Sequence, residues 1–503
     1  MPFRGYIRAL KGTVRRQKDA LLPSPEVREY EQWREQHLAV RQSRYPELPE
    51  PGLLSILTPV WNGSPVNYLR ALAGCIAPQN PNGACEWVIF DNGCTNARLT
   101  GYLQSLQERS WIKLIHSPKN IGIANGLRQC LEQASGRYVL PVDGDDLLYP
   151  DALRVVAAWI KRAGSPALLY TDEDKVIGRR YYQPYFKPDW DPVLFLNSAY
   201  IAHLGVIDRV KALELRAYSD PAAEGSADWD LFMRFFLAGY APVHIPEVVY
   251  SWRVHGQSTA DDAASKPYIH ASQKAVLQRF LDGRGYAPQY EIEYSPLLGG
   301  AAHWHFTTRA KQLPDEFVSF IGEDVRPDRT DWASEALSIF ELHPDTVIVG
   351  GRIRNSRGII TEAGRHFGFG GACGCPNRGR RADDPGYFAQ MWKQRSVSAV
   401  LTQFAVIRSE FLAEVQRTLP NGASAAFLGA WAGALAFRQG KRVVYSPFLS
   451  GVSDLDWETL ISDSEKQLFL EKNASIIPDR RFYPVGFSLT RPFGLGDPAC
   501  RES

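Results

Sequence analysis

Three carboxylates stand within four residues, directly after an apolar run. The run covers residues 138–142, and Asp143, Asp145 and Asp146 follow it. Carboxylates this close repel one another, and a bound divalent cation relieves that repulsion. A hard cation held by one or two carboxylates is also a common way to grip the phosphates of a nucleotide. The segment therefore predicts a site for Mg2+ or Mn2+, with a solvated acidic turn before a helix near Pro150 as the alternative.

Further acidic residues recur where other apolar runs end. They are Asp91, Asp172 and Glu173, and Asp228 opens an amphipathic stretch that runs to Phe236. His255 follows another apolar stretch, and its imidazole could complete a metal site or contact a diphosphate. A structural role is the alternative for this histidine. The repeated placement of such groups after apolar runs indicates one shared site.

Short apolar runs alternate with helical patterns from about residue 53 onward. The first of these runs cover residues 53–60, 87–90, 112–116 and 138–142. Strands that alternate with helices predict an α/β fold, a mostly parallel sheet covered on both faces. Ligands of such sheets bind beyond the carboxyl ends of the strands, which is where the acidic residues fall.

The composition is that of a multidomain globular chain. At about 100 to 200 residues per domain, 503 residues predict two to four domains. Lys and Arg total 57 against 55 Asp and Glu, a balance that gives no reason to expect a nucleic-acid partner. No apolar run of about 18 residues and no signal-like start occurs, so neither a membrane span nor export is expected.

The cysteines favour a cytoplasmic setting. There are seven, dispersed along the chain, and only Cys373 and Cys375 lie close together. A single intervening residue is not the spacing of a zinc knuckle, and no second pair follows. Reduced thiols of a cytoplasmic protein are therefore expected.

The first 20 residues have the pattern of a basic amphipathic helix. Phe3, Ile7, Leu10 and Val14 share one face, among Arg and Lys residues. Such a helix can lie on an anionic bilayer surface, or it can dock on the protein with its basic face in solvent. Lipid binding would place the protein at the inner face of the cytoplasmic membrane. Prolines around a charged helical segment predict a domain boundary near residue 50.

Taken together, these segments resemble family 2 of the glycosyltransferases, the inverting enzymes of the glycosyltransferase-A fold, over about residues 53–280. Residues 55–62 resemble the family's opening strand and loop, and residues 88–95 resemble its second strand. Residues 120–126 resemble the segment that precedes the family's metal motif. Asp143-Gly144-Asp145 stands in the place of the family's DxD motif. A narrower likeness to bacterial O-antigen and capsule glycosyltransferases rests on residues 170–175, 186–192 and 245–255. The resemblance implies a Rossmann-like catalytic domain with a mostly parallel sheet.

The same resemblance implies roles for individual residues. Asp228 occupies the general-base position, although Ala227 replaces the usual acidic or amide neighbour. The metal ligands implied are Asp143, Asp145 and His255, with Mn2+ or Mg2+ as cofactor. The implied contacts to the nucleotide sugar are Thr58, Pro59, Asp91, Asn120, Asp143, Asp145, Asp172 and Glu173. Trp190 and Trp229 could stack on a sugar ring or belong to the core.

From about residue 286 the alternation of strands and helices begins again and resembles a second, truncated glycosyltransferase-like domain. Gly322 and Glu323 stand in the place of the metal motif, and residues 427–432 lack the carboxylates expected of a base. Too few residues lie between the first domain and the Gly322 segment to form the nucleotide-binding strands that would precede it. The predicted domains are thus an N-terminal helical segment, a glycosyltransferase-A catalytic domain and a degenerate, non-catalytic domain, at residues 1–50, 51–285 and 286–503. The last could bind the acceptor glycan or an assembly protein, or serve only as a structural extension.

The function implied is transfer of one sugar, with inversion, from a nucleotide-diphosphate donor to a growing bacterial surface glycan. The acceptor would be a glycan or lipid-linked glycan of O-antigen, capsule or lipopolysaccharide core. The alternative is a non-catalytic scaffold that binds sugar nucleotide or glycan within a polysaccharide assembly complex. Retention of Asp143, Asp145, Asp228 and His255 together favours the enzyme.

Overall fold

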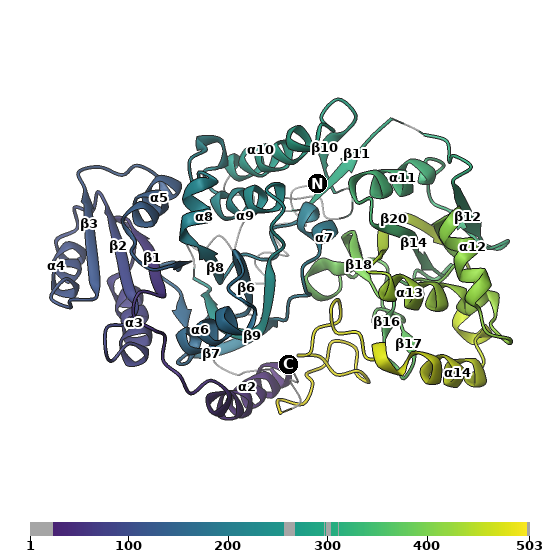
Figure 1. The fold of residues 1–503 in the computed structure, drawn as a ribbon, viewed down its shortest axis with the longest axis horizontal. Helices are drawn as coiled ribbons and strands as arrows, with labels where there is room; N and C mark the ends of the chain where they lie inside the picture. The colour runs from purple at the N-terminus through teal and green to yellow at the C-terminus, as the bar shows by residue number, and fades with distance from the viewer. Residues whose placement is uncertain (1–23, 256–266, 296, 298–302, 310, 500–503) are drawn as a thin grey trace. The chain divides into compact units, whose positions relative to one another are not determined.

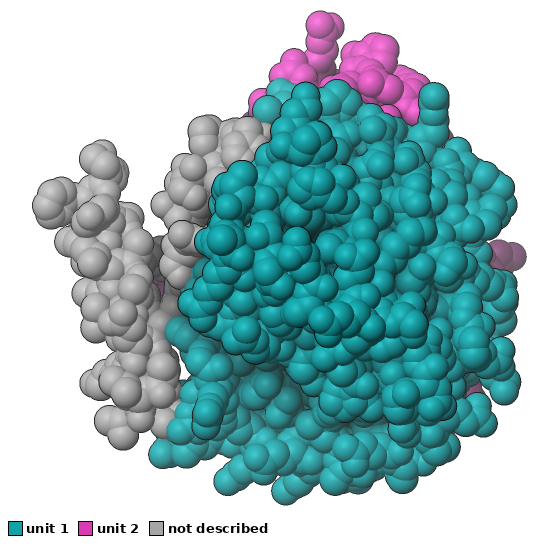
Figure 2. Space-filling model, turned by 90° about the vertical axis from the view of Figure 1, so that its left-hand side faces the viewer, with its two compact units in different colours: residues 1–187, 201–276, 497–503 teal, residues 188–200, 277–496 magenta. Residues whose placement is uncertain are grey.

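The computed structural model describes residues 24–255, 267–295, 297, 303–309 and 311–499. The basic helix predicted over residues 1–20 lies outside this range. The chain divides into two compact units, shown in teal and magenta in Figure 2. Unit 1 comprises residues 1–187, 201–276 and 497–503, and unit 2 comprises residues 188–200 and 277–496.

Unit 1 is built on a nine-stranded sheet of order β3-β2-β1-β4-β8-β6-β9-β5, with β7 paired to β6 (Figure 1). The strands are β1 (Leu54–Val60), β2 (Glu86–Asn92), β3 (Ile112–Ser117), β4 (Tyr138–Pro141), β5 (Leu147–Leu148), β6 (Leu168–Ile177), β7 (Arg180–Tyr185), β8 (Gly205–Asp208) and β9 (Val243–Arg253). Strands β1 to β4 are mutually parallel, as are β6 and β9, whereas β8 runs antiparallel to both β4 and β6.

The four apolar runs in the sequence become β1 to β4. Parallel strands are covered on both faces, so they favour continuous apolar sequences, and Leu54, Ile56 and Leu57 of β1 are indeed wholly buried. The helices of unit 1 are α2 (Pro25–Arg44), α3 (Val66–Ile76), α4 (Ala97–Leu106), α5 (Ile123–Gln133), α6 (Ala152–Arg162), α8 (Arg209–Glu214) and α9 (Ala227–Leu237). Helix α5 packs on β1 and β2, and α6 packs on β9. The predicted α/β class is confirmed.

Helix α2 belongs to unit 1, although the sequence pattern set the first 50 residues apart. It begins after Ser24, whose side chain accepts the Val27 amide and caps the helix. Helix α10 (Pro267–Arg284) continues from unit 1 into unit 2. The predicted start of the second domain, residue 286, falls inside unit 2, whose main segment begins at residue 277. Among the described residues, none of the helices is long and apolar enough to span a membrane.

Unit 2 has a seven-stranded sheet of order β12-β19-β14-β20-β13, with β15 on β14 and β18 on β20. Its strands are β12 (Phe317–Ile321), β13 (Arg326–Pro327), β14 (Thr346–Arg354), β15 (Ile360–Glu362), β18 (Arg395–Val397), β19 (Phe404–Arg408) and β20 (Arg442–Val452). The helices around it are α7 (Pro192–Asn197), α11 (Trp332–Leu342), α12 (Ser409–Thr418), α13 (Leu428–Arg438) and α14 (Asp463–Asn473). Two small two-stranded sheets complete the unit, β10 (Glu291–Tyr294) with β11 (Trp304–Thr307) and β16 (His366–Phe367) with β17 (Cys373–Gly374).

The strand pairing of unit 2 repeats that of the second half of unit 1. The pairs β12–β19 and β19–β14 are antiparallel, β14–β20 is parallel and β13–β20 is antiparallel. The pairs β4–β8, β8–β6, β6–β9 and β5–β9 have the same senses in the same order. In the described part of unit 2, the sheet has no counterpart of β1, β2 and β3. The described part of unit 2 thus has the topology of the second half of unit 1 alone.

Helices α9 and α13 occupy equivalent places before the last long strand of each unit, and each has 11 residues. The second residue is Asp228 in α9 and Gly429 in α13. A Cβ built on Gly429 would lie 1.9 Å from the Val400 carbonyl oxygen, and one on Gly433 would lie 2.3 Å from the Ser398 carbonyl oxygen. Helix α13 therefore packs directly on backbone, and no carboxylate fits where unit 1 carries Asp228.

We expect Gly429→Ala to destabilise unit 2 by about 1–3 kcal/mol, because the added methyl group has no space beside the Val400 carbonyl. Urea unfolding followed by circular dichroism measures the change. The matched control is Gly101→Ala in α4, where a Cβ meets nothing within 4 Å and a gain of about 0.5–1 kcal/mol is expected from helix propensity. An unchanged midpoint in Gly429→Ala would contradict the tight packing of α13.

Candidate active site

The carboxylates that follow β4 form a compact group. Asp143, Asp145 and Asp146 each offer one carboxylate oxygen, and these oxygens lie within 4.8 Å of one another. Asp146 is buried and anchored, because it accepts hydrogen bonds from the Tyr250 hydroxyl and, at 2.7 Å, from the Arg253 backbone N–H. Asp143 is exposed and Asp145 half-buried, so these two carboxylates are the ones that can meet a ligand.

The charges of this group oppose one another. Although Asp143 reaches solvent, the surrounding protein removes part of its water and raises the pKa of its carboxyl to about 6; Asp145 and Asp228 add to the rise and His203 opposes it. Burial, with the charges of Asp143 and Asp145, raises the pKa of Asp146 well above its ordinary value. A hard divalent cation prefers such carboxylate oxygens as ligands, and its charge would relieve their mutual repulsion.

Two residues at the end of β9 enclose Asp145. Its Oδ2 lies 2.8 Å from His255 Nε2, and its backbone oxygen accepts a 2.5 Å hydrogen bond from Arg253 Nε. The Arg253 guanidinium lies over the Tyr68 ring at 4.4 Å. Its Nη2 is buried without a hydrogen-bond partner among the described residues. The structure thus brings together the three predicted metal ligands Asp143, Asp145 and His255, and it adds an arginine suited to an anion.

Asp228 lies close to this group. It is the second residue of α9 and half-buried, and its Oδ1 accepts the Trp229 backbone N–H at 2.8 Å. Its charge contributes to the raised pKa of Asp143 and of the buried Tyr218, which places it within electrostatic reach of the carboxylate group. Of the predicted tryptophans, Trp229 is buried in unit 1 and Trp190 lies in unit 2.

His203 is a site residue that the sequence patterns missed. Its Nδ1 lies 3.4 Å from Glu173 Oε2, and its ring stacks on Tyr250 at 5.1 Å. Burial alone would lower the pKa of His203, but its hydrogen bond to Glu173 and the charges of Glu173, Asp143 and Asp146 raise it to about 9. The imidazole is therefore protonated at neutral pH and places a positive charge beside the carboxylates. No acidic run or apolar strand end flags this residue, so no local signal could have found it.

Glu173 and Asp172 are held inside the protein. Lys187 Nζ lies 3.1 Å from Glu173 Oε2 and donates to the carbonyl oxygens of Ala202 and His203. Asp172 Oδ1 accepts the Lys187 backbone N–H at 2.8 Å and lies 2.9 Å from His244 Nε2. Glu173 thus acts on the carboxylate group indirectly, by binding His203.

The predicted nucleotide contacts lie at the ends of β1 and β2 and after β3. Asp91 is buried, accepts the Cys94 backbone N–H at 2.9 Å and lies 2.9 Å from His116 Nδ1. Asn120 is exposed, and its Oδ1 accepts the Gly122 backbone N–H at 2.9 Å.

Thr58 and Pro59 lie side by side on β1. Thr58 is buried, donates to the Val142 carbonyl oxygen at 2.9 Å and accepts from Trp87 Nε1 at 3.0 Å. Pro59 is half-buried. Thr58 thereby ties β1 to the residue directly before Asp143.

Comparison with known proteins identifies the domain that carries this site. Residues 55–199 match the model of Glycosyl transferase family 2. The chain is 25% identical to Uncharacterized protein y4gI of Sinorhizobium fredii over 440 residues, which cover 71% of this chain and 48% of that protein. It is 27% identical to O-antigen biosynthesis protein RfbC of Myxococcus xanthus over 274 residues, 52% of this chain and 21% of that protein.

The chain spans about half or less of the length of these two relatives. Among solved structures, Staphylococcus aureus TarS 1-349 in complex with UDP-GlcNAc shares 21% identity at a TM-score of 0.39, covering 46% of this chain and 67% of that one. The family match covers β1 to β7, including the carboxylate group after β4. Residues 55–199 therefore form a family 2 glycosyltransferase domain.

Proposed function

We propose that this chain is an inverting, metal-dependent glycosyltransferase that moves a sugar from a nucleotide-diphosphate donor to a growing bacterial surface glycan. One observation carries the proposal: within a family 2 domain, Asp143, Asp145 and Asp146 converge to within 4.8 Å beside Asp228. Similarity to a protein named for O-antigen biosynthesis supports a surface glycan, free or lipid-linked, as the acceptor.

Asp228 is the general base of the proposed reaction. An acceptor hydroxyl oxygen attacks the anomeric carbon of the donor, the bond from that carbon to the diphosphate oxygen breaks, and the hydroxyl proton passes to the Asp228 carboxylate. Attack from the face opposite the leaving group inverts the anomeric centre. A half-buried carboxylate at the start of α9 can meet a bulky acceptor from solvent and still lie near the donor.

Asp143 and Asp145 are the proposed ligands of a divalent cation, Mn2+ or Mg2+, with His255 beside them. Such a cation, when bound, neutralises the charge that builds on the departing diphosphate. Arg253, through its unpartnered Nη2, and protonated His203 add positive charge at the same place. The chain thus offers its own donors and cations to the diphosphate in addition to the metal ligands.

The nucleotide sugar is proposed to lie along the ends of β1, β2 and β3. Direct contacts are assigned to Pro59, Asp91 and Asn120, because these residues border that edge of the sheet. Thr58 and Asp172 act by holding the strands in place, since their polar atoms bind other protein groups. We place the reaction in the cytoplasm, with residues 1–20 as the contact to an anionic membrane surface and assembly-complex proteins as further partners.

Titration of the purified chain with UDP, dTDP and GDP, with and without Mn2+ or Mg2+, tests the donor site. One nucleotide is expected to bind only when the cation is present, and Asp145→Ala is expected to weaken that binding at least about tenfold by removing a proposed ligand. Asp315→Ala, which changes an exposed carboxylate of unit 2, is the matched control. Absence of binding by all three nucleotides would favour the non-catalytic scaffold.

A further inference from the structure

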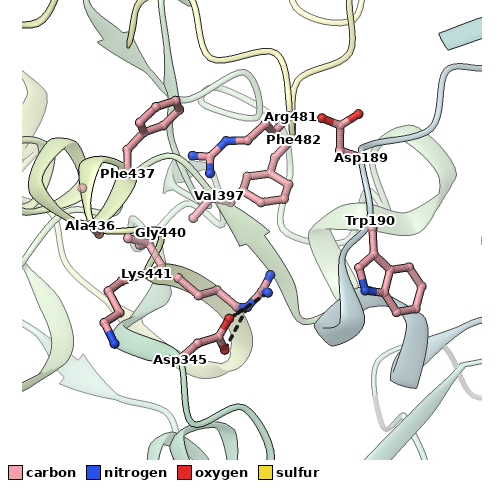
Figure 3. A pocket seen from close by; sticks show the side chains of 13 residues that line it. Asp189, Trp190, Asp345, Val397, Ala436, Phe437, Gly440, Lys441, Arg481 and Phe482 are labelled. Atoms are coloured by element: carbon pink, nitrogen blue, oxygen red, sulfur yellow. Dashed lines mark hydrogen bonds and ion pairs between the residues drawn. The ribbon is translucent and has the colours of Figure 1, made fainter. Parts of the chain in front are cut away.

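Unit 2 contains a cavity of about 150 Å³ at the amino ends of its parallel strands β14 and β20 (Figure 3). The carboxyl ends of the corresponding strands carry the active site in unit 1, so this cavity does not correspond to the donor site. Its walls come from residues 189–190, the start of β14, the region from α13 to the start of β20, and residues 481–482. All of these residues belong to unit 2.

The segment that carries Trp190 is fastened to the rest of unit 2. The Asp189 backbone N–H donates to the Arg481 carbonyl oxygen at 2.7 Å. The buried Asp191 carboxylate accepts the Ser396 backbone N–H and hydroxyl, both at 2.7 Å. The walls of the cavity are therefore in place before a ligand arrives, which lowers the entropy cost of binding.

The two guanidinium groups that line the cavity are paired with carboxylates. Arg481 binds the two oxygens of Asp479 through Nε and Nη2, each at 2.9 Å, and Asp479 is only 2% exposed. Arg442 forms a 2.9 Å ion pair with Asp345, drawn as a dashed line in Figure 3. Guanidinium groups that already have carboxylate partners still donate hydrogen bonds, but they attract a free anion less than unpaired cations do.

Aromatic rings supply the apolar part of the lining. Trp190, Phe437 and Phe482 are each half-buried, and the Arg481 guanidinium lies 4.0 Å over the Phe437 ring. Figure 3 shows Phe437, Phe482 and Arg481 grouped at one side of the cavity, with Trp190 on another wall. Fixed hydrogen-bonding groups beside aromatic faces match a sugar ring, which has an apolar C–H face and a rim of hydroxyl groups.

We propose that this cavity binds one uncharged sugar ring of the glycan that the chain extends. The choice of a glycan rests on the proposed function, whereas the cavity and its lining do not. Its volume is below the roughly 300–1,000 Å³ of sites that enclose a whole small ligand, which suits one ring of a longer chain. Unit 2, which lacks the base and the nucleotide strands, would thereby hold the acceptor.

An array of immobilised bacterial O-antigen and capsule polysaccharides, neutral and acidic, probed with the full chain without nucleotide, tests this proposal. We expect the chain to bind polysaccharides that contain uncharged sugars. We expect the Phe482→Ala variant to bind them with an affinity at least about tenfold lower. Phe482→Leu keeps the apolar bulk but removes the ring, so it is expected to lose binding as well while the thermal midpoint stays near that of the parent. Leu460→Ala, at an exposed apolar side chain of unit 2, is the matched control and should bind normally.

Three results would overturn the proposal: no binding to any polysaccharide, equal binding by Phe482→Leu, or binding restricted to acidic polysaccharides and displaced by inorganic phosphate. The last result would identify an anion site. Nucleotide titrations separate this proposal from the proposed function, because Phe482→Ala should leave cation-dependent nucleotide binding unchanged. Asp145→Ala should likewise leave polysaccharide binding unchanged.

Discussion

The Asp228→Asn variant is expected to transfer sugar about 10²–10⁴-fold more slowly than the parent chain, because the asparagine amide cannot take the acceptor proton. The affinity for the nucleotide sugar should change little, since Asp228 lies outside the proposed cation ligands. The substitution keeps the size of the side chain and an oxygen that can accept the Trp229 N–H. Steady-state kinetics together with donor titration separate the two effects.

The control for this experiment is Glu214→Gln, which removes an exposed carboxylate from α8 of the same unit and should leave the rate unchanged. Parent-like turnover in Asp228→Asn would exclude Asp228 as the base. In cells, unimpaired glycan assembly by a well-folded Asp228→Asn variant would support the scaffold alternative. Loss of donor binding in the purified variant would instead assign Asp228 to the donor site.

The Arg41→Met variant is expected to lose about 3–5 kcal/mol of stability, because it leaves the buried Asp151 carboxylate without its cation and Glu247 with only His37 as a basic partner. Arg41 is wholly buried on α2 and binds both oxygens of Asp151, at 2.8 and 2.6 Å. It also donates to the Val248 carbonyl oxygen at 2.7 Å and lies 3.4 Å from Glu247 Oε2. Burial by itself would lower the pKa of Arg41. The negative charges of Glu247 and Asp151 more than offset this effect and raise that pKa.

Urea unfolding followed by tryptophan fluorescence measures this loss. Arg28→Met, at an exposed position of the same helix, is the matched control and should change stability by less than about 0.5 kcal/mol. A loss of similar size in both variants would show that the effect comes from the helix rather than from the buried ion pairs. A small loss in Arg41→Met would contradict the anchoring of α2 on unit 1.

Local patterns in the sequence were enough for the α/β class and for the carboxylate group. Four continuous apolar runs became β1 to β4, because a strand buried on both faces requires an unbroken stretch of such residues. Asp143, Asp145 and Asp146 are neighbours in the chain, so their proximity needs no distant contact. The sense of the parallel sheet then brings Asp91 and the residues after β4 to one edge.

Contacts between distant residues decided the rest of the site and the anchoring of α2. His255 meets Asp145 across 110 residues, and Arg41 meets Glu247 across 206. His203 becomes a protonated neighbour of the carboxylates only because Lys187 binds its carbonyl oxygen and Glu173, on β6, binds its imidazole. No periodicity or spacing encodes such pairs.

The division of the chain into two compact units could not be predicted from local sequence patterns either. Residues 188–199 lie within the family match, yet they belong to unit 2, where Asp191 binds Ser396. The sequence by itself determined the strands, the carboxylate cluster and the family, because each depends on neighbours along the chain. Only the tertiary structure decided which buried charges pair, where the 188–200 segment packs and why positions 429 and 433 of α13 admit glycine alone. These features depend on long-range packing that excludes water and leaves no room for other side chains.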